Sequence, residues 1–176
     1  MRKLLMTSLL VSGAALVAAQ APAQAPAPAA PPAPAAVPEQ MPFDIPYGPS
    51  ITLDRAMQAA AAAEAKKHNW KLAITVVDPN GDLVFFQKMD GTQVASAAIS
   101  QGKARTAARY RRETRTFFNA METGHPYIAT PDPTLVASPG GFPLMDGGKL
   151  IGAIGCSGGT GDQDAVACKA GSAAFM

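Results

Sequence analysis

The sequence predicts an α/β domain in which a mainly antiparallel sheet is flanked by helices. Two pairs of apolar segments are each joined by a tight-turn sequence, Asp78-Pro79-Asn80-Gly81 in the first pair and Asp146-Gly147-Gly148 in the second. Turns this short connect antiparallel strands. Helical patterns precede, separate and follow the two pairs. The helices are therefore expected to pack on the sheet.

The elements follow from hydrophobic spacing and from residues that start or stop them. Thr52 is a suitable N-cap, and the apolar residues after it keep helical spacing to about His68. Gly124-His125-Pro126 ends the second of two central helices, and Asp162 is the expected N-cap of the last helix. After the first helix the expected elements are, in order, strands at 70–77 and 83–87, helices at 93–110 and 114–121, two or three strands, and a helix from 162 to 174. Two of these later strands are at 142–145 and 149–156, and the third, if formed, is at 134–137.

Composition divides the chain into three parts. Residues 1–19 have a basic start and an apolar run that is shorter than the roughly 20 residues of a membrane span, so they are predicted to be a cleaved signal peptide. Residues 20–49 hold ten of the sixteen prolines among many alanines, which predicts a disordered tether. Residues 50–176 are enough for one domain. A periplasmic or secreted location is therefore expected, with no membrane span after cleavage.

The charge balance excludes two classes of binding partner, and the cysteine content suggests a disulfide. Removing Arg2 and Lys3 with the signal peptide lowers the basic count from 15 to 13, equal to the 13 acidic residues. Attraction to nucleic acid or to an anionic membrane is therefore not expected. Export allows Cys156 and Cys168 to oxidise, so one disulfide is hypothesised, with two buried thiols as the alternative.

A basic cluster is the densest charge feature of the chain. Lys103, Arg105 and Arg109 belong to it, and Arg105, Arg109 and Arg112 fall within an arc of about 60° on a helix. Beside an apolar helix face, such a rim is a candidate site for a small anionic ligand, such as a carboxylate or a propionate group. The alternatives are a solvated face and pairing with acidic groups across an oligomer interface.

A glycine-rich loop between a strand and a helix is the second candidate anion site. Its amides, from Gly158, Gly159, Thr160 and Gly161, would face a ligand at a helix N-terminus. The loop lacks the Gly-Lys-Ser/Thr sequence and the glycine spacing of nucleotide-binding loops. The alternative is a tight connection whose Asp162 only caps the helix.

The two histidines, His68 and His125, stand in no metal-spacing motif, so a zinc site formed by protein ligands alone is not expected. A single imidazole can still be an axial haem ligand, and His125 is the better candidate because the adjacent proline holds its loop. The alternative is a surface histidine. No serine, histidine and acid arrangement predicts a nucleophilic triad.

Three blocks in order resemble the GlcG/HbpS family of haem-binding and haem-degrading-type domains. They are NWKLAITVVDPNGDLVFFQKMDG, ISQGKARTAARYRRET and GGFPLMDGGKLIGAIGCSGGTGDQD. The resemblance implies a profilin-like sandwich around a five-stranded antiparallel sheet, and homo-oligomers from dimers to octamers. Haem is the implied cofactor. The chain is also similar to a domain appended to corrinoid adenosyltransferases, so a corrinoid or no cofactor are the alternatives.

The chain also departs from the family. The family usually carries a small aliphatic residue at position 156 and often alanine at 168, so the cysteine pair is particular to this chain or a subset. His125 lies where the glycolate-operon relative carries arginine, so the resemblance implies no ligand role for it. The expected function is haem or tetrapyrrole binding by an exported oligomer. Alternatives are an enzyme or accessory factor for a short hydroxy or oxo acid, and a ligand-free assembly or sensor-partner module.

Overall fold

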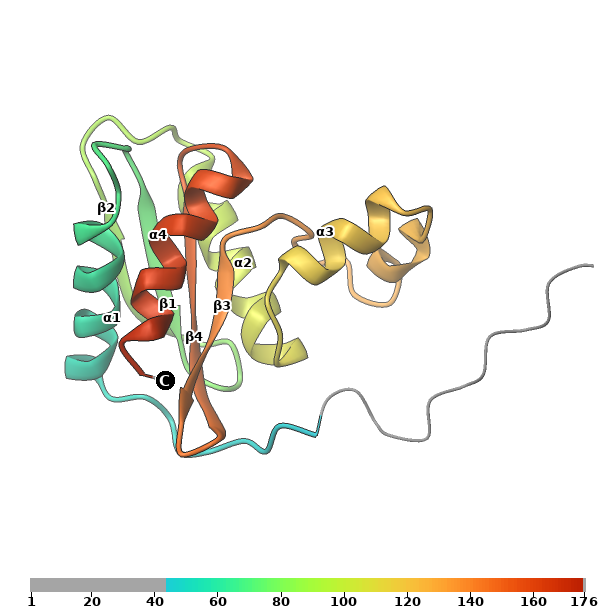
Figure 1. Ribbon diagram of the computed structural model, residues 1–176, viewed down its shortest axis with the longest axis horizontal. Coiled ribbons are helices and arrows are strands. Elements are labelled where there is room, and N and C mark those ends of the chain that lie inside the picture. The colour runs from blue at the N-terminus through green and yellow to red at the C-terminus, as the bar shows by residue number, and fades with distance from the viewer. Residues whose placement is uncertain (1–43, 176) are drawn as a thin grey trace, which may run out of the picture. The chain divides into compact units, whose positions relative to one another are not determined.

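The computed structural model describes residues 44–175 and contains a four-stranded antiparallel sheet between helices (Figure 1). The sheet has the order β2-β1-β4-β3, and every neighbouring pair is antiparallel. The elements are α1 (Leu53–Ala65), β1 (Ala73–Val77), β2 (Leu83–Lys88), α2 (Ser96–Tyr110), α3 (Arg115–Glu122), the 3-10 helix η1 (Pro126–Ala129), β3 (Gly141–Asp146), β4 (Lys149–Ser157) and α4 (Gly161–Ala173). The predicted fold class is therefore confirmed.

Two details of the predicted sheet differ from the structure. The sheet of the described residues has four strands, whereas the family resemblance implied five. The predicted strand at 134–137 is irregular chain, because Asp132 and Thr134 form a turn there. Thr134 donates both its backbone and its side-chain hydrogen bonds to Asp132 Oδ1, at 2.8 and 2.6 Å. These local bonds compete with pairing to a neighbouring strand.

The helices cover the two faces of the sheet. Figure 1 shows α1 and α4 side by side on one face and α2 on the other. Side chains alternate accordingly along β1: Ile74 and Val76 join the larger core with α1 and α4, while Val77 packs against the alanines of α2. Gly155 on β4 lets α2 approach closely, because a Cβ there would collide with the backbone of Ser100.

The described chain begins with a segment that pairs with β4. Gly48 N donates to Leu150 O at 2.7 Å, and Leu150 N donates to Pro46 O at 2.9 Å. The fold thus includes residues within the 20–49 range predicted as a tether. The predicted signal peptide at 1–19 and the tether up to residue 43 lie outside the described residues. No helix within 44–175 is long and apolar enough to cross a membrane.

The ends of two helices test the predicted caps. Thr52 caps α1 as predicted, since its side chain accepts from Arg55 N. The predicted N-cap of α4, Asp162, is wrong because Thr160 occupies that position. Thr160 Oγ1 accepts from Gln163 N at 3.3 Å, and Gln163 Oε1 accepts from Thr160 N at 2.8 Å. This reciprocal pair is a capping box.

A disulfide joins α4 to the sheet. Cys156 on β4 and Cys168 on α4 are bonded, with a Cα–Cα distance of 5.6 Å, and both side chains are fully buried. This confirms the disulfide hypothesis over two buried thiols. The bond fixes α4 to β4, and the glycine loop directly precedes α4.

Candidate functional site

Two arginines on α2 lie over the turn between β1 and β2. Arg105 Nε donates to Gly81 O, and Arg109 Nε donates to Asn80 O, each at 3.2 Å. The turn is itself rigid, because Asp78 Oδ1 accepts from both Asn80 N and Asp82 N at 2.9 Å. Both guanidinium groups are therefore positioned by consecutive carbonyls of one turn. Arg112, predicted in the same helical arc, lies beyond the end of α2, because Arg111 is left-handed and ends the helix.

Arg105 and Arg109 touch no carboxylate among the described residues, although Asp132 is within electrostatic reach of Arg109. Hydrogen bonds from Thr134 lower the pKa of Asp132, and the charge of Arg109 adds to that shift. Neither arginine forms an ion pair among the described residues, and their terminal nitrogens have no acceptor within that part of the chain. Like charges one helical turn apart repel each other. An anion bound between the two guanidinium groups would relieve this repulsion through charge-assisted hydrogen bonds.

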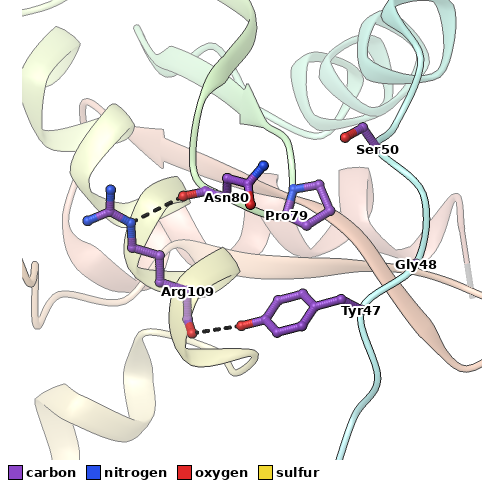
Figure 2. Close-up of a pocket in the computed structure, with 6 residues that line it drawn as sticks. All are labelled: Tyr47, Gly48, Ser50, Pro79, Asn80 and Arg109. Atoms are coloured by element: carbon purple, nitrogen blue, oxygen red, sulfur yellow. Dashed lines mark hydrogen bonds between the residues drawn. The ribbon is translucent and has the colours of Figure 1, made fainter.

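A surface pocket of about 530 Å³ adjoins Arg109. Figure 2 shows the side chains of Tyr47 and Pro79 around it, with Arg109 at one side and Ser50 at the other. The lining residues are Tyr47, Gly48, Ser50, Pro79, Asn80 and Arg109. Tyr47 Oη donates to Arg109 O at 3.2 Å, so the tyrosine is attached to the last turn of α2. The pocket thus combines two apolar rings with hydroxyl, amide and guanidinium groups.

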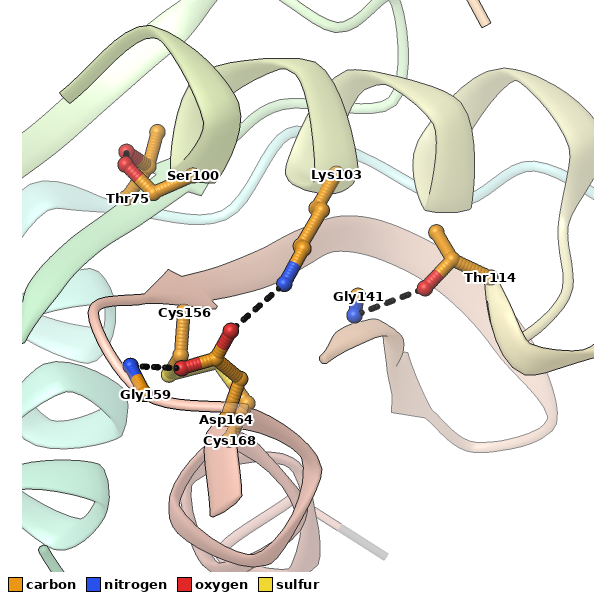
Figure 3. The surroundings of a disulfide bond; sticks show 9 residues. All are labelled: Thr75, Ser100, Lys103, Thr114, Gly141, Cys156, Gly159, Asp164 and Cys168. Carbon is orange, nitrogen blue, oxygen red and sulfur yellow. Dashed lines mark hydrogen bonds and ion pairs between the residues drawn. A yellow bond between two sulfur atoms is a disulfide. The ribbon is translucent and has the colours of Figure 1, made fainter. Parts of the chain in front are cut away.

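Lys103 does not share the surface of the two arginines. Its side chain is 1% exposed, and its Nζ lies 2.7 Å from Asp164 Oδ2 on α4 (Figure 3). Burial lowers the pKa of Lys103, and the attraction of Asp164 opposes that shift. The pair joins helices on opposite faces of the sheet. Lys103 is thus placed as a buried structural cation, and its predicted contact with a surface anion would require this pair to open.

Amides of the glycine loop already have acceptors within the protein. Gly159 N donates to Asp164 Oδ1 at 3.0 Å (Figure 3), and Thr160 N donates to Gln163 Oε1. Gly158 lies against the backbone of Lys71 and Leu72. The arrangement around Gly159 and Thr160 therefore corresponds to the alternative interpretation of the loop, a tight connection that caps α4, with Thr160 as the capping residue.

His125 lies in the segment between α3 and η1. Its ring is exposed, and its contacts are local: Thr123 Oγ1 is 3.4 Å from Nδ1, and the Tyr127 ring centroid is 6.0 Å away. It shares no hydrogen bond or ring contact with Arg105 or Arg109. Within residues 44–175, no group of three or more histidine, cysteine or acidic side chains could hold a metal ion.

Sequence reasoning missed Tyr47 and Ser50, which line the pocket. Both fall within or directly after the range predicted as a tether. The available signal was the sequence Pro46-Tyr47-Gly48, which places an aromatic residue at the end of an alanine and proline repeat. Arg111 helps to hold the segment that contains Tyr47, because its Nη1 donates a hydrogen bond to Ile45 O at 2.7 Å.

The model of the haem degrading protein HbpS-like family matches residues 51–173. Protein GlcG of Escherichia coli K12 is 43% identical over 102 residues, which cover 58% of this chain and 75% of GlcG.

Two solved structures share the fold. Klebsiella pneumoniae protein ORFY superposes with a TM-score of 0.68 at 30% identity, covering 77% of this chain and 97% of ORFY. A double mutant of Streptomyces reticuli HbpS gives a TM-score of 0.67 at 28% identity, covering 82% of this chain and 99% of HbpS. Both matches cover nearly the full length of the solved chains.

Proposed function

Because the chain belongs to the haem degrading protein HbpS-like family, we propose that it is an exported protein that binds haem or a related tetrapyrrole. One observation assigns the proposed binding to specific residues. Arg109 lines the pocket, Arg105 lies one helical turn before it and outside the lining, and neither forms an ion pair among the described residues. Haem carries two propionates, and its apolar ring would lie toward Tyr47 and Pro79.

The residues present fit one part of the haem group. The two arginines match its carboxylates, whereas the six residues that line the pocket include no histidine, cysteine or methionine. The pocket therefore supplies recognition of the propionates and of the ring edge. We propose His125 as the axial ligand, because a histidine imidazole nitrogen is a common ligand of haem iron. When bound, haem would supply the redox chemistry of its iron, and the protein residues would orient it and neutralise its carboxylates.

Export and assembly complete the proposal. The basic and apolar pattern of residues 1–19 supports a signal peptide, and hence a periplasmic or secreted protein. Similarity to HbpS over 82% of the chain supports a homo-oligomer in the range from dimer to octamer. Mass measurement of the native protein in solution tests the assembly. A monomer at micromolar concentration would contradict it.

Purification after native export tests the haem proposal most simply. An absorption scan of the purified protein should show a Soret band, and added haemin should give a spectrum distinct from haemin with an unrelated protein. Substituting His125→Ala tests the axial ligand separately, since loss of that residue should shift the band without abolishing binding. A haemin spectrum that is identical with and without the protein would refute the proposal.

A second candidate function uses the same arginine pair. The pocket carries Ser50 and Asn80 beside Arg109, which suit the hydroxyl or oxo group of a short acid whose carboxylate is held by the guanidinium. The protein would then be an enzyme or accessory factor for such an acid. This candidate requires that Arg109→Ala abolish an activity on a short hydroxy or oxo acid while haemin binding is unchanged.

A further inference from the structure

We infer that residues 45–50 are a built part of the ligand site and that Tyr47 selects ligands whose carboxylate is attached to an apolar body. The inference rests on the proposed function for the carboxylate and adds a determinant of specificity to it. Its starting point is that the pocket lining extends beyond the part of the chain that matches the family. The family match begins at residue 51, whereas Tyr47, Gly48 and Ser50, half of the pocket lining, come before it.

The sheet fixes the backbone of this segment. Tyr47 forms a parallel bridge with Leu150 on β4, and hydrogen bonds of 2.7 and 2.9 Å flank it at Gly48 and Pro46. Ile51 N then donates to Ile151 O at 2.8 Å. The segment therefore continues along β4 beyond the end of β1, and its side chains have defined positions.

The end of α2 fixes the same segment from the other side. Tyr47 Oη donates to the carbonyl of Arg109, and Arg111 Nη1 donates to Ile45 O at 2.7 Å. The Arg111 guanidinium also lies 5.1 Å from the centre of the Tyr47 ring, within range of a cation–π interaction. The helix turn that carries Arg109 thus also holds Tyr47. The ring is positioned beside the arginine that is proposed to bind the carboxylate.

The Tyr47 ring is available to a ligand. It is 50% exposed, although its hydroxyl group and one ring contact are already satisfied within the protein. Figure 2 shows the ring and Pro79 near each other, with the Arg109 carbonyl next to the Tyr47 hydroxyl group and the Arg109 guanidinium at the Asn80 carbonyl. An aromatic or alicyclic body would cover the exposed ring surface while its carboxylate reached the guanidinium. The chemical class of ligand is therefore a carboxylate on an apolar body, either a haem propionate or a free aryl acid.

Two probes that differ only in the apolar body test this inference on the full chain. Wild type should bind 3-phenylpropionate roughly three- to tenfold tighter than propionate, measured by NMR titration of the ligand. Tyr47→Ala should bind the two probes with about equal affinity, while Tyr47→Phe should keep the preference. Tyr127→Ala is the matched control, because Tyr127 is an exposed tyrosine outside the pocket.

Three results would overturn the inference. The first is a preference for 3-phenylpropionate that persists in Tyr47→Ala. The second is an equal loss of affinity for both probes in Tyr47→Ala, as expected for a purely structural residue. The third is a loss of the preference in Tyr47→Phe as large as that in Tyr47→Ala. A haemin titration separates the inference from the proposed function. Wild type that binds 3-phenylpropionate with the expected preference but not haemin refutes the proposed function alone. If wild type does bind haemin, equal haemin affinity of wild type and Tyr47→Ala refutes the inference alone.

Discussion

Replacing Lys103 by methionine should destabilise the protein far more than an exposed lysine substitution would. The Lys103 and Asp164 side chains are 1% and 3% exposed, and their charged atoms are 2.7 Å apart. Removing the lysine leaves the Asp164 carboxylate buried with Gly159 N as its remaining donor. Breaking a buried ion pair from one side costs about 3–5 kcal/mol. Lys103→Met should therefore lower the free energy of unfolding by about that amount.

A double variant separates the charge from the packing. Lys103→Met with Asp164→Asn removes both charges and keeps an acceptor for Gly159 N, so it should recover all but about 1–2 kcal/mol of the wild-type stability. Urea unfolding followed by the fluorescence of Trp70, the only tryptophan, gives the free energies. Lys169→Met, on the exposed surface of α4, is the control. Equal losses in the single and double variants would refute the electrostatic argument.

Two further predictions concern stability. Removing the disulfide by Cys156→Ala and Cys168→Ala should lower the free energy of unfolding by about 3 kcal/mol, because the bond closes a loop of sequence separation 12; an unchanged urea midpoint without reductant would contradict this. Hydrogen bonds from Lys67 and then Gln87 lower the pKa of Glu64 below its ordinary 4.5. Ionised Glu64 thus stabilises the fold above about pH 4.5, and this stabilisation is lost as the pH falls through the lowered pKa. The difference in the free energy of unfolding between wild type and Glu64→Gln should be under about 1 kcal/mol for so exposed a group. Unfolding curves measured at acidic pH should show no such difference. A difference that persists at low pH would refute this role of Glu64.

Local patterns explain which parts of the fold could be predicted. Alternating apolar residues and tight turns specified the strand pairs, and helical spacing placed Arg105 and Arg109 on one face of α2. The same spacing turns Lys103 about 200° from Arg105, which separates it from that face. Its burial was not predictable, because the partner that permits it, Asp164, lies 61 residues further along the chain.

The glycine loop illustrates a missed local signal. Thr160 and Gln163 have the three-residue separation of a capping box, which identifies the helix start and assigns acceptors to its amides. The glycines alone left two interpretations open, an anion site and a tight connection that caps the helix. For Tyr47 the sequence Pro46-Tyr47-Gly48 marks only an aromatic residue at the end of the alanine and proline repeat, because its position depends on pairing with Leu150 across 103 positions of the sequence. Such long-range pairing follows from the finished sheet and not from local pattern.

Haemin titration of wild type against the double variant Arg105→Gln and Arg109→Gln tests the central claim most directly. Each lost charge-assisted hydrogen bond is expected to cost about 1.5–3 kcal/mol, so the double variant should bind haemin at least about tenfold more weakly. Arg115→Gln, at an arginine paired with Asp162 and Glu113, should bind like wild type. Equal haemin affinity in all three proteins would contradict the assignment of the arginine pair as the carboxylate site.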